Sequence, residues 1–284
     1  MVGGWHADAS GRPISEIVMS VVLITGCSSG FGRAAAIAFA ARGDDVVATM
    51  RNTAKADGLG DIDGITVDQL DIVDAGSRAG AVVRALDRFG RIDVLVNNAG
   101  VSALGPAEEI PDQVMRDQFE TNFFGPFALI RELLPSMRAN NTGRIVNVTS
   151  IGAVMTSGFY SDYCATKHAM DAISLGLDIE LQHFGIRVAT VVPGGYTTSM
   201  VSNLIDTQRP DTLYPRYATT LEEYKGRMSG KEDLSPVTDA IIAAATDPEP
   251  RARYLVGKGS AEMLRTIVDE GQKVHDFLRA REAG

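Results

Sequence analysis

Three side chains capable of acid–base chemistry stand at fixed spacing in the middle of the chain: Ser150, Tyr163 and Lys167. The tyrosine and the lysine are four residues apart within a stretch that predicts a helix, so they would lie on one helical face. A tyrosine has a pKa of about 10 and is a poor acid–base catalyst at neutral pH, but a neighbouring ammonium favours the phenolate and lowers that pKa. The spacing therefore predicts a proton-transfer site.

A glycine-rich turn near the start of the chain has the composition of a phosphate cradle. Gly26, Gly30 and Gly32 follow an apolar run that ends at Thr25 and precede an alanine-rich helical stretch. Glycines let the backbone turn tightly and approach a pyrophosphate, and the helix N-terminus presents N–H groups to it. The remaining members of the predicted cradle are Ser28, Ser29 and Phe31. The turn therefore predicts a bound dinucleotide.

The residue after the second predicted strand indicates which dinucleotide binds. An NAD site usually carries Asp or Glu here, to hydrogen-bond the ribose 2′-hydroxyl. In this chain the strand ends at Met50 and is followed by Arg51, whose guanidinium suits a 2′-phosphate. We expect NADP(H) to be the preferred cofactor, with NAD(H) as the alternative if Arg51 is a solvated surface residue.

These motifs occur together and in a characteristic order. The chain carries Thr25-Gly26-x3-Gly30-x-Gly32, then Asn97-Asn98-Ala99-Gly100, then Ser150 with Tyr163-x3-Lys167. The set resembles the short-chain dehydrogenase/reductase family, in its branch of compact single-domain subunits, over residues 21–198 and more loosely to 257. Residues 163–169 are most similar to its hydroxysteroid and retinol dehydrogenases. The resemblance implies an NADP(H)-dependent enzyme that interconverts a carbonyl and a secondary alcohol, although many NADP-using relatives carry a second basic residue where this chain has Ser29.

The resemblance also assigns four catalytic roles. Tyr163 would protonate a carbonyl oxygen during reduction or deprotonate an alcohol during oxidation, and Ser150 would hold that oxygen beside it. Lys167 would lower the pKa of the tyrosine and hydrogen-bond the nicotinamide ribose. Asn122 matches the fourth member of the set and would hold a water in a proton relay to Lys167.

Further cofactor contacts are implied where later strands end. Asp71 matches the position that binds the adenine amino group, although it fits equally well as a cap for the helix that begins near Ala75. Asn98 would hold the central sheet and the adenine-side ribose. Thr198 completes a Pro-Gly-x3-Thr pattern and would contact the cofactor amide or phosphates. The other contacts predicted in these segments are Ala99, Gly100, Pro193 and Gly194.

Apolar, β-branched runs alternate with helical periodicities along the chain. Strands are predicted at 18–25, 45–50, 64–67, 93–97, 144–149, 187–192 and 253–256, and helices, among others, at 32–42, 75–89, 112–138 and 161–184. Strands that are apolar throughout require burial on both faces. The alternation predicts an α/β fold, a Rossmann-type doubly wound parallel sheet of about seven strands. We expect one domain over residues 16–284 after a flexible extension at 1–15.

Residues 199–231 interrupt this alternation and have little periodicity. We interpret them as a lid over the substrate, the alternative being an irregular surface connection. The candidate pocket walls are Ser102, Leu104, Gly152, Val154, Phe159, Gly195, Tyr196 and this stretch. Their largely apolar character favours a small apolar ketone or secondary alcohol as the substrate.

Composition and charge also indicate which classes of ligand and cellular location are unfavourable for this chain. A formal net charge of −9 disfavours nucleic acid, because phosphate binding requires a basic face. The first apolar run is too short to span a bilayer and residues 1–16 lack the features of a signal peptide, so we expect a cytoplasmic protein without a membrane segment. Neither the two cysteines nor the four histidines have metal-ligand spacing.

Two other classes of protein share part of this set of motifs. A non-catalytic dinucleotide sensor would have the same cradle but no need of the catalytic set. A sugar-nucleotide epimerase shares Tyr-x3-Lys but typically has Gly-x2-Gly-x2-Gly, which differs from the spacing here. We also expect a homodimer or homotetramer, since proteins of this family often associate through the long helices that correspond to 112–138 and 161–184.

Overall fold

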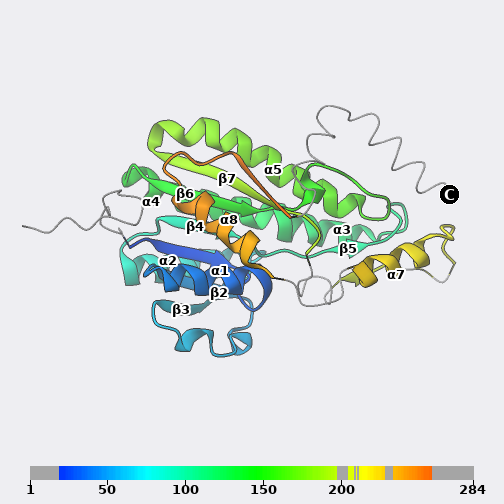
Figure 1. Ribbon diagram of the computed structural model, residues 1–284, viewed down its shortest axis with the longest axis horizontal. Helices are drawn as coiled ribbons and strands as arrows, with labels where there is room; N and C mark the ends of the chain where they lie inside the picture. Colours follow the sequence, from blue (N-terminus) through cyan, green and yellow to red (C-terminus); the bar gives the residue numbers. More distant parts are fainter. Residues whose placement is uncertain (1–18, 197–203, 208, 210, 228–232, 258–284) are drawn as a thin grey trace, which may run out of the picture.

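The computed structural model describes residues 19–196, 204–207, 209, 211–227 and 233–257. Seven parallel strands form one sheet in the order β3-β2-β1-β4-β6-β7-β9 (Figure 1). Their bounds are β1 Val21–Thr25, β2 Asp45–Met50, β3 Ile65–Gln69, β4 Val94–Asn97, β6 Gly143–Val148, β7 Ile186–Pro193 and β9 Arg253–Val256. The chain runs outward from β1 to β3, returns to β4 and continues to the other edge, so the order reverses between β1 and β4. The predicted doubly wound sheet is confirmed.

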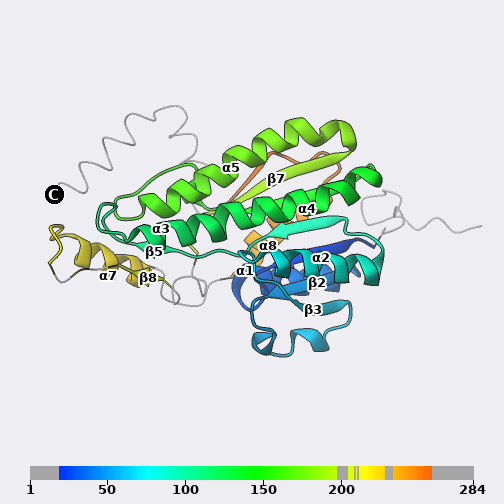
Figure 2. The same cartoon turned by 180° about the vertical axis from the view of Figure 1, so that it is seen from behind.

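Helices cover both faces of the sheet. The helices α1 (Gly30–Ala41) and α8 (Ser235–Thr246) lie on one face, and α2 (Ala75–Phe89), α4 (Gly125–Ala139) and α5 (Ser161–Leu181) lie on the other (Figures 1 and 2). Successive side chains of a strand point alternately into the two helical layers. In β1, Val22 and Ile24 pack with Phe39 and Ile241, whereas Val21 and Leu23 pack with the α2, α4 and α5 side. This two-sided burial is why the strands are apolar throughout.

The predicted helix at 112–138 is divided in the structure. It consists of α3 (Asp112–Phe119), a π-helical turn at Glu120–Phe124 and α4. Gly125 follows the π turn where the helix passes close to the loop after β3, and a Cβ there would lie 3.0 Å from the carbonyl carbon of Ile72. Single π turns within α-helices are frequently found at functional sites. Here the turn contains Asn122.

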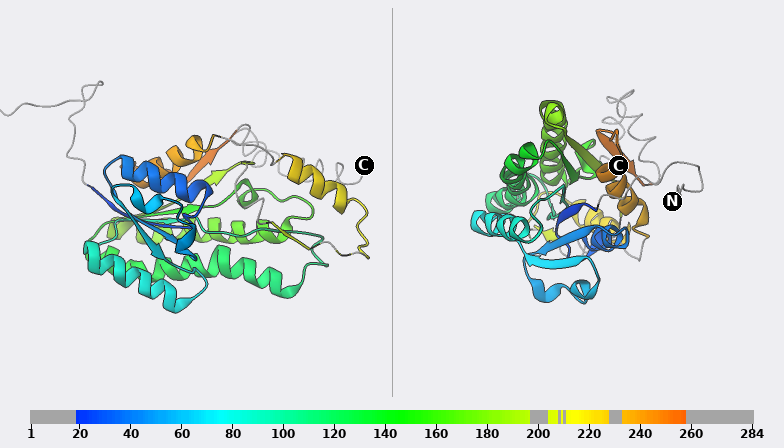
Figure 3. Two further views of the ribbon diagram at one scale, coloured as in Figure 1. Left: turned by 90° about the horizontal axis from the view of Figure 1, so that it is seen from below. Right: turned by 90° about the vertical axis from the view of Figure 1, so that its left-hand side faces the viewer.

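The stretch 199–231 has more regular structure than its sequence predicts. Within its described residues, β8 (Ile205–Asp206) pairs with β5 (Ala103–Leu104), and α7 (Tyr217–Arg227) lies off the end of the sheet (Figure 3, left). Tyr217 is fully buried, and its hydroxyl lies 2.7 Å from both the Leu104 carbonyl oxygen and Asp206 Oδ1. These contacts tie α7 to the short β5–β8 sheet, so the alternative of an irregular surface connection is wrong for this part, and the lid stays a prediction.

Two other expectations can be compared with the described part of the chain. None of its helices combines the length and the apolar character needed to cross a membrane. It also contains no cluster of three or more His, Cys, Asp or Glu side chains arranged to hold a metal ion. The predicted extension at 1–15 lies outside the described residues. The end-on view shows the sheet between its two helical layers (Figure 3, right).

Candidate active site

A cleft of about 850 Å³ follows the carboxyl ends of the strands. Its lining includes the segments that follow β1, β2, β3, β4, β6 and β7. In an open α/β sheet this edge, where the strand order reverses, is the usual place for a ligand. Of the site residues predicted from the sequence, the following line the cleft: Gly26, Ser28, Ser29, Gly30, Phe31, Arg51, Asp71, Asn98, Ala99, Gly100, Ser150, Tyr163, Lys167, Pro193 and Gly194. Gly32 and Asn122 are not part of the lining, and Thr198 lies outside the described residues.

The turn from β1 to α1 has a backbone that requires its glycines. Gly26 has a φ of +76° and Gly30 a φ of +57°, both in the left-handed region. A Cβ on Gly32 would lie only 2.5 Å from the Gly26 carbonyl oxygen, so a side chain there would force the turn apart. With Ser29 as the extended N-cap residue, α1 begins at Gly30 and directs its N-terminus at the cleft. This arrangement suits a pyrophosphate.

Asn98 joins the end of β4 to the end of β1. Its Nδ2 donates to the Thr25 carbonyl oxygen at 2.9 Å, and the backbone N–H groups of Asn98 and Ala99 both donate to Thr25 Oγ1 at 3.0 Å. A Cβ on Gly26 would lie 2.9 Å from the Ala99 Cα, so the two segments are in close contact. The residue therefore holds together the two central strands at the point where they flank the cleft.

At the far end of the cleft the structure separates the two readings of Asp71. The N-cap of α2 is Asp74, whose Oδ1 accepts from the Ser77 N–H at 2.5 Å, so the alternative in which Asp71 caps this helix is wrong. Asp71 Oδ1 instead accepts from the Val73 N–H at 3.2 Å, and Asp71 lines the cleft. This leaves the interpretation as a nucleotide contact.

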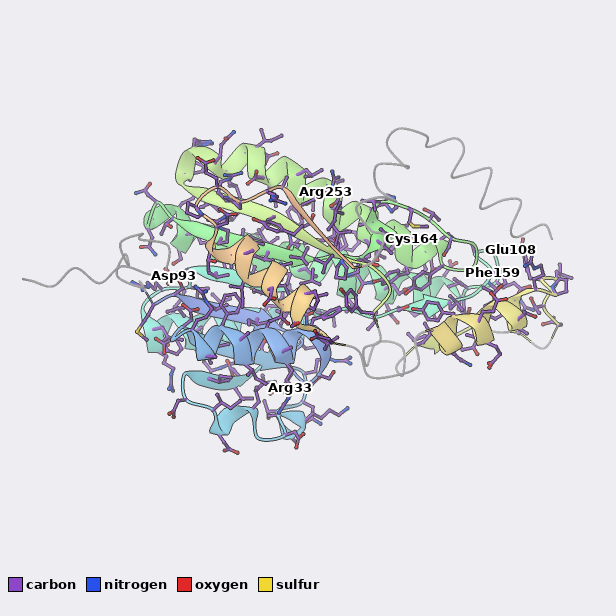
Figure 4. The ribbon with its side chains drawn as sticks, viewed as in Figure 1. Arg33, Asp93, Glu108, Phe159, Cys164 and Arg253 are labelled. Carbon is purple, nitrogen blue, oxygen red and sulfur yellow. The ribbon has the colours of Figure 1, made fainter. Side chains whose placement is uncertain are left out.

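Lys55 joins Arg51 at this end of the cleft and is a residue that sequence reasoning missed. Both side chains line the cleft, and Lys55 lies in the 3-10 turn Thr53–Lys55 that follows β2. Arg33 of α1 fixes the backbone just beyond this turn, because its guanidinium donates to the carbonyl oxygens of Ala56 and Asp57 at 2.5 and 2.6 Å. In Figure 4, Arg33 lies beside this segment. The signal available in the sequence was a second cation four residues after Arg51.

At the other end of the cleft, Tyr163 and Lys167 are buried on one face of α5. The Ser150 hydroxyl hydrogen-bonds the Tyr163 phenol. The Lys167 ammonium donates to the Val148 carbonyl oxygen at 3.1 Å, and its nitrogen lies 5.8 Å from the centroid of the Tyr163 ring. The three side chains that predicted a proton-transfer site are therefore brought together.

Burial sets the protonation of this group. It raises the pKa of the Tyr163 phenol above its ordinary range, with the Ser150 hydrogen bond acting in the opposite direction. Burial also lowers the pKa of Lys167 to about 8. Lys167 is not among the causes of the shift in the Tyr163 pKa, so its expected lowering of that pKa in the presence of the cofactor stays a prediction. At neutral pH the phenol holds its proton.

Asn122 is fully engaged within the protein. Its Oδ1 accepts from the Val101 N–H at 2.9 Å, and its Nδ2 donates to the Val101 carbonyl oxygen at 2.9 Å and to Thr166 Oγ1 at 3.0 Å. Thr166 lies next to Lys167 on α5 and also donates to the Tyr163 carbonyl oxygen. These bonds connect the π turn, the segment after β4 and the part of α5 that carries Tyr163 and Lys167.

The substrate end of the cleft differs from the predicted walls. Ser102, Gly195 and Tyr196 line it, together with Ile205 and Tyr224 from the stretch 199–231 and with Tyr160, which sequence reasoning missed. The other predicted wall residues, Leu104, Gly152, Val154 and Phe159, are not part of the lining. Leu104 and Phe159 instead pack with the residues that hold α7, and Phe159 lies beside α7 in Figure 4.

The two cysteines take no part in the cleft lining. Both thiols are free and buried, and burial raises the pKa of Cys27 to about 12 and that of Cys164 to about 11. Cys164 is near Gly152, where a Cβ would lie 3.2 Å from its sulfur. Thiols held neutral in this way are poor nucleophiles.

Comparisons with known proteins agree with this geometry. Residues 20–209 match the sequence model of a family described as short chain dehydrogenase. An uncharacterized oxidoreductase of Bacillus subtilis, YusZ, is 36% identical over 253 residues, which cover 84% of this chain and 89% of the relative. Retinol dehydrogenase 8 of Bos taurus is 37% identical over 252 residues, 80% of this chain and 79% of that protein.

Solved structures share the fold over most of the chain. The structure of a short-chain dehydrogenase from Streptomyces avermitilis has a TM-score of 0.83 and 32% identity, and the match covers 95% of this chain and 99% of that one. Other solved proteins of this fold are in complex with NAD or with NADP. The fold described above is therefore shared with proteins that hold a nicotinamide dinucleotide.

Proposed function

Because the chain belongs to the short-chain dehydrogenase family of oxidoreductases acting on alcohol and carbonyl groups, we propose that it uses NADP(H) to interconvert a ketone or aldehyde and an alcohol, with Tyr163 as the general acid/base. The observation that carries this proposal is the hydrogen bond between Ser150 and Tyr163 within the same cleft as the glycine turn. The turn fits a pyrophosphate, and the hydroxyl pair fits a substrate oxygen.

The bound nicotinamide cofactor would supply the hydride. Its phosphates would lie against the Gly26–Gly32 turn, and its nicotinamide would lie near Lys167 and Gly194. The protein supplies the proton. Ser150 and Tyr163 hold the substrate oxygen, and the phenol, which is protonated at neutral pH, transfers its proton to that oxygen as the carbonyl is reduced. In the oxidation direction the same oxygen returns its proton to the tyrosine.

Two further residues position this chemistry. The Lys167 ammonium, held by the Val148 carbonyl oxygen, stabilises negative charge on the phenolate left after proton transfer. Asn122 has both side-chain polar atoms bound to Val101 and Thr166. We therefore assign it the positioning of the turn beside the catalytic helix, in place of direct contact between its side chain and a relay water.

The charge at the end of β2 supports NADP(H) as the preferred cofactor. Residues 51–55 place two cations, Arg51 and Lys55, in the cleft lining and contain no carboxylate. A 2′-phosphate would gain charge-assisted hydrogen bonds there, whereas a free 2′-hydroxyl would lack the carboxylate that NAD sites provide. Many NADP-using relatives carry a second basic residue where this chain has Ser29, and we propose that Lys55 takes the role of that residue here.

The two free cysteines suit a reducing compartment, and we propose the cytoplasm as the location of the protein.

The proposed chemistry is tested by replacing the tyrosine hydroxyl. In Tyr163→Phe we expect the turnover of ketones with NADPH to fall by at least about 1,000-fold, since the proton donor is lost while the ring is retained. NADPH affinity, followed by nucleotide fluorescence, should change little, and this serves as the folding control. Unchanged turnover would exclude the enzymatic role of Tyr163, and tight NADPH binding without turnover in the unmodified chain would favour a dinucleotide sensor.

A further inference from the structure

A second group of hydroxyls lies beside the catalytic pair. It consists of Ser102 after β4, Tyr160 just before α5 and Tyr224 on α7, and we call it the hydroxyl triplet. The Tyr160 hydroxyl lies 2.8 Å from Ser102 Oγ and 3.2 Å from the Tyr224 hydroxyl. All three residues line the cleft. The triplet thus brings together three segments that are far apart in the sequence, at the end of the cleft where the substrate would bind.

Ring stacking fixes the triplet relative to the reacting group. The rings of Tyr160 and Tyr163 are stacked with centroids 4.5 Å apart and planes inclined by only 22°. Both residues line the same cleft, so the Tyr160 ring lies directly against the ring of the proposed acid/base. A substrate oxygen held by Tyr163 and Ser150 would therefore have the triplet as its immediate neighbour.

The triplet is suited to neutral hydrogen bonding. Burial raises the pKa of Tyr160 well above its ordinary range, so this phenol keeps its proton throughout the range in which enzymes work. The Tyr160–Tyr224 contact of 3.2 Å is longer than a normal bond between hydroxyls, whereas the Ser102–Tyr160 contact is of normal length. The longer contact, between Tyr160 and Tyr224 of α7, is the weaker of the two, so these two hydroxyls are the ones that can turn to hydrogen-bond a further oxygen atom in the cleft.

We propose that the substrate carries a second oxygen, as a hydroxyl or carbonyl on the carbon next to the reacting carbon, and that this oxygen hydrogen-bonds the hydroxyls of Tyr160 and Tyr224 from the cleft. This inference rests on the proposed function and specifies its substrate class as α-hydroxyketones and α-diketones or the corresponding vicinal diols. It adds an oxygen to the apolar substrate expected from the sequence, because the cleft lining includes Tyr160 and Tyr224 and does not include Leu104 or Phe159.

The test compares ketones that differ only in the second oxygen. Suitable pairs are butan-2-one with 3-hydroxybutan-2-one, cyclohexanone with 2-hydroxycyclohexanone, and 1-tetralone with 2-hydroxy-1-tetralone. For each pair the ratio of kcat/KM for the hydroxyketone to kcat/KM for the plain ketone is measured with NADPH. We expect Tyr160→Phe and Tyr224→Phe each to lower this ratio about three- to tenfold, the effect of one neutral hydrogen bond. The intrinsic reactivity of each pair is the same for every variant, and general damage to a variant cancels in the ratio.

Tyr214→Phe is the matched control. Its hydroxyl also belongs to the 199–231 stretch but donates to Glu108 Oε1 at 2.5 Å, and Tyr214 is not part of the cleft lining. Its ratio should equal that of the unmodified chain. Equal ratios in all four proteins, with ketones being reduced, would overturn the inference and leave the proposed function intact. Reduction of none of the six ketones would contradict the proposed function itself, and the inference with it.

Discussion

At the scale of single residues, cofactor choice depends on two cations in a five-residue segment. Arg51 and Lys55 both line the cleft, and Arg33 holds the backbone that follows them. Replacing Arg51 with Asp should weaken NADPH binding about 10- to 100-fold, since a charge-assisted hydrogen bond contributes about 1.5–3 kcal/mol. Lys55→Gln should have a smaller effect in the same direction. NADH binding should be kept in both variants, and the measurement is a fluorescence titration with each nucleotide.

The control for this prediction is Arg88→Gln. Arg88 is an exposed cation on α2, stacked over Phe89 and outside the cleft lining, so its loss changes the net charge by the same amount as Lys55→Gln. An equal fall in NADPH affinity in the two neutralised variants would point to long-range charge alone. An Arg51→Asp variant that still preferred NADPH would contradict the proposed cofactor.

The protonation of Lys167 predicts a pH limit on the reaction. Burial disfavours its charged form, so its pKa of about 8 lies below the ordinary lysine value and the ammonium is lost as pH rises through this range. The phenol of Tyr163 keeps its proton there, because its pKa is raised. We expect kcat/KM for ketone reduction to be constant below about pH 8 and to fall above it with a single ionisation.

An arginine at this position separates the charge from other effects of pH. In Lys167→Arg the charge persists through pH 10. The activity of this variant should be lower than that of the unmodified chain, because a guanidinium group is larger than an ammonium group. This activity should not fall between pH 8 and 10. A flat profile to pH 10 in the unmodified chain, with the melting temperature unchanged over the range, would show that the lysine charge is not required.

At the scale of elements, the sheet could be predicted because a strand that is buried on both faces has a continuous run of apolar residues. β1, β4 and β7 are apolar at nearly every position, since alternate residues enter the two helical layers. The glycine turn and the Tyr163–Lys167 pair could be predicted for a related reason. Each is a short-range pattern whose geometry is fixed by one turn or one helix, so the spacing of its residues in the sequence determines how far apart they lie in the structure.

The elements that sequence missed depend on partners far along the chain. The two-residue strands β5 and β8 are too short to show any alternation, and they pair across about one hundred positions. The π turn adds no periodic signal of its own and is held by Asn122 bonding to Val101. Tyr160 reaches the cleft with contacts of this kind, to Ser102 and Tyr224, and Lys55 lies just before the backbone that Arg33 holds. This is why the motif residues were identified and these two were not.

At the scale of the whole molecule, the exposed apolar side chains suggest how subunits associate. Phe124 in the π turn, Met115 on α3 and Ile179 on α5 are exposed, at 50%, 40% and 69% respectively. The Phe124 ring contacts the rings of Phe119 and Phe123, so it lies at the edge of an aromatic cluster. The helices α4 and α5, which the sequence analysis proposed as an interface, lie on the same face of the sheet (Figure 2).

We therefore predict a homodimer, or a tetramer built from it, in which Phe124 is buried. In a two-fold symmetric interface each substitution acts twice, and burying one phenylalanine contributes about 1.5–3 kcal/mol, so Phe124→Asp should lower the dimer affinity at least 100-fold. Light scattering at micromolar concentration should then give a monomer mass for Phe124→Asp. Val83→Asp is the control, because Val83 is comparably exposed, at 55%, but lies on α2, which is not one of the helices of the predicted interface. A monomer mass for the unmodified chain would refute the assembly, and dissociation by both variants would place the interface elsewhere on this face of the sheet.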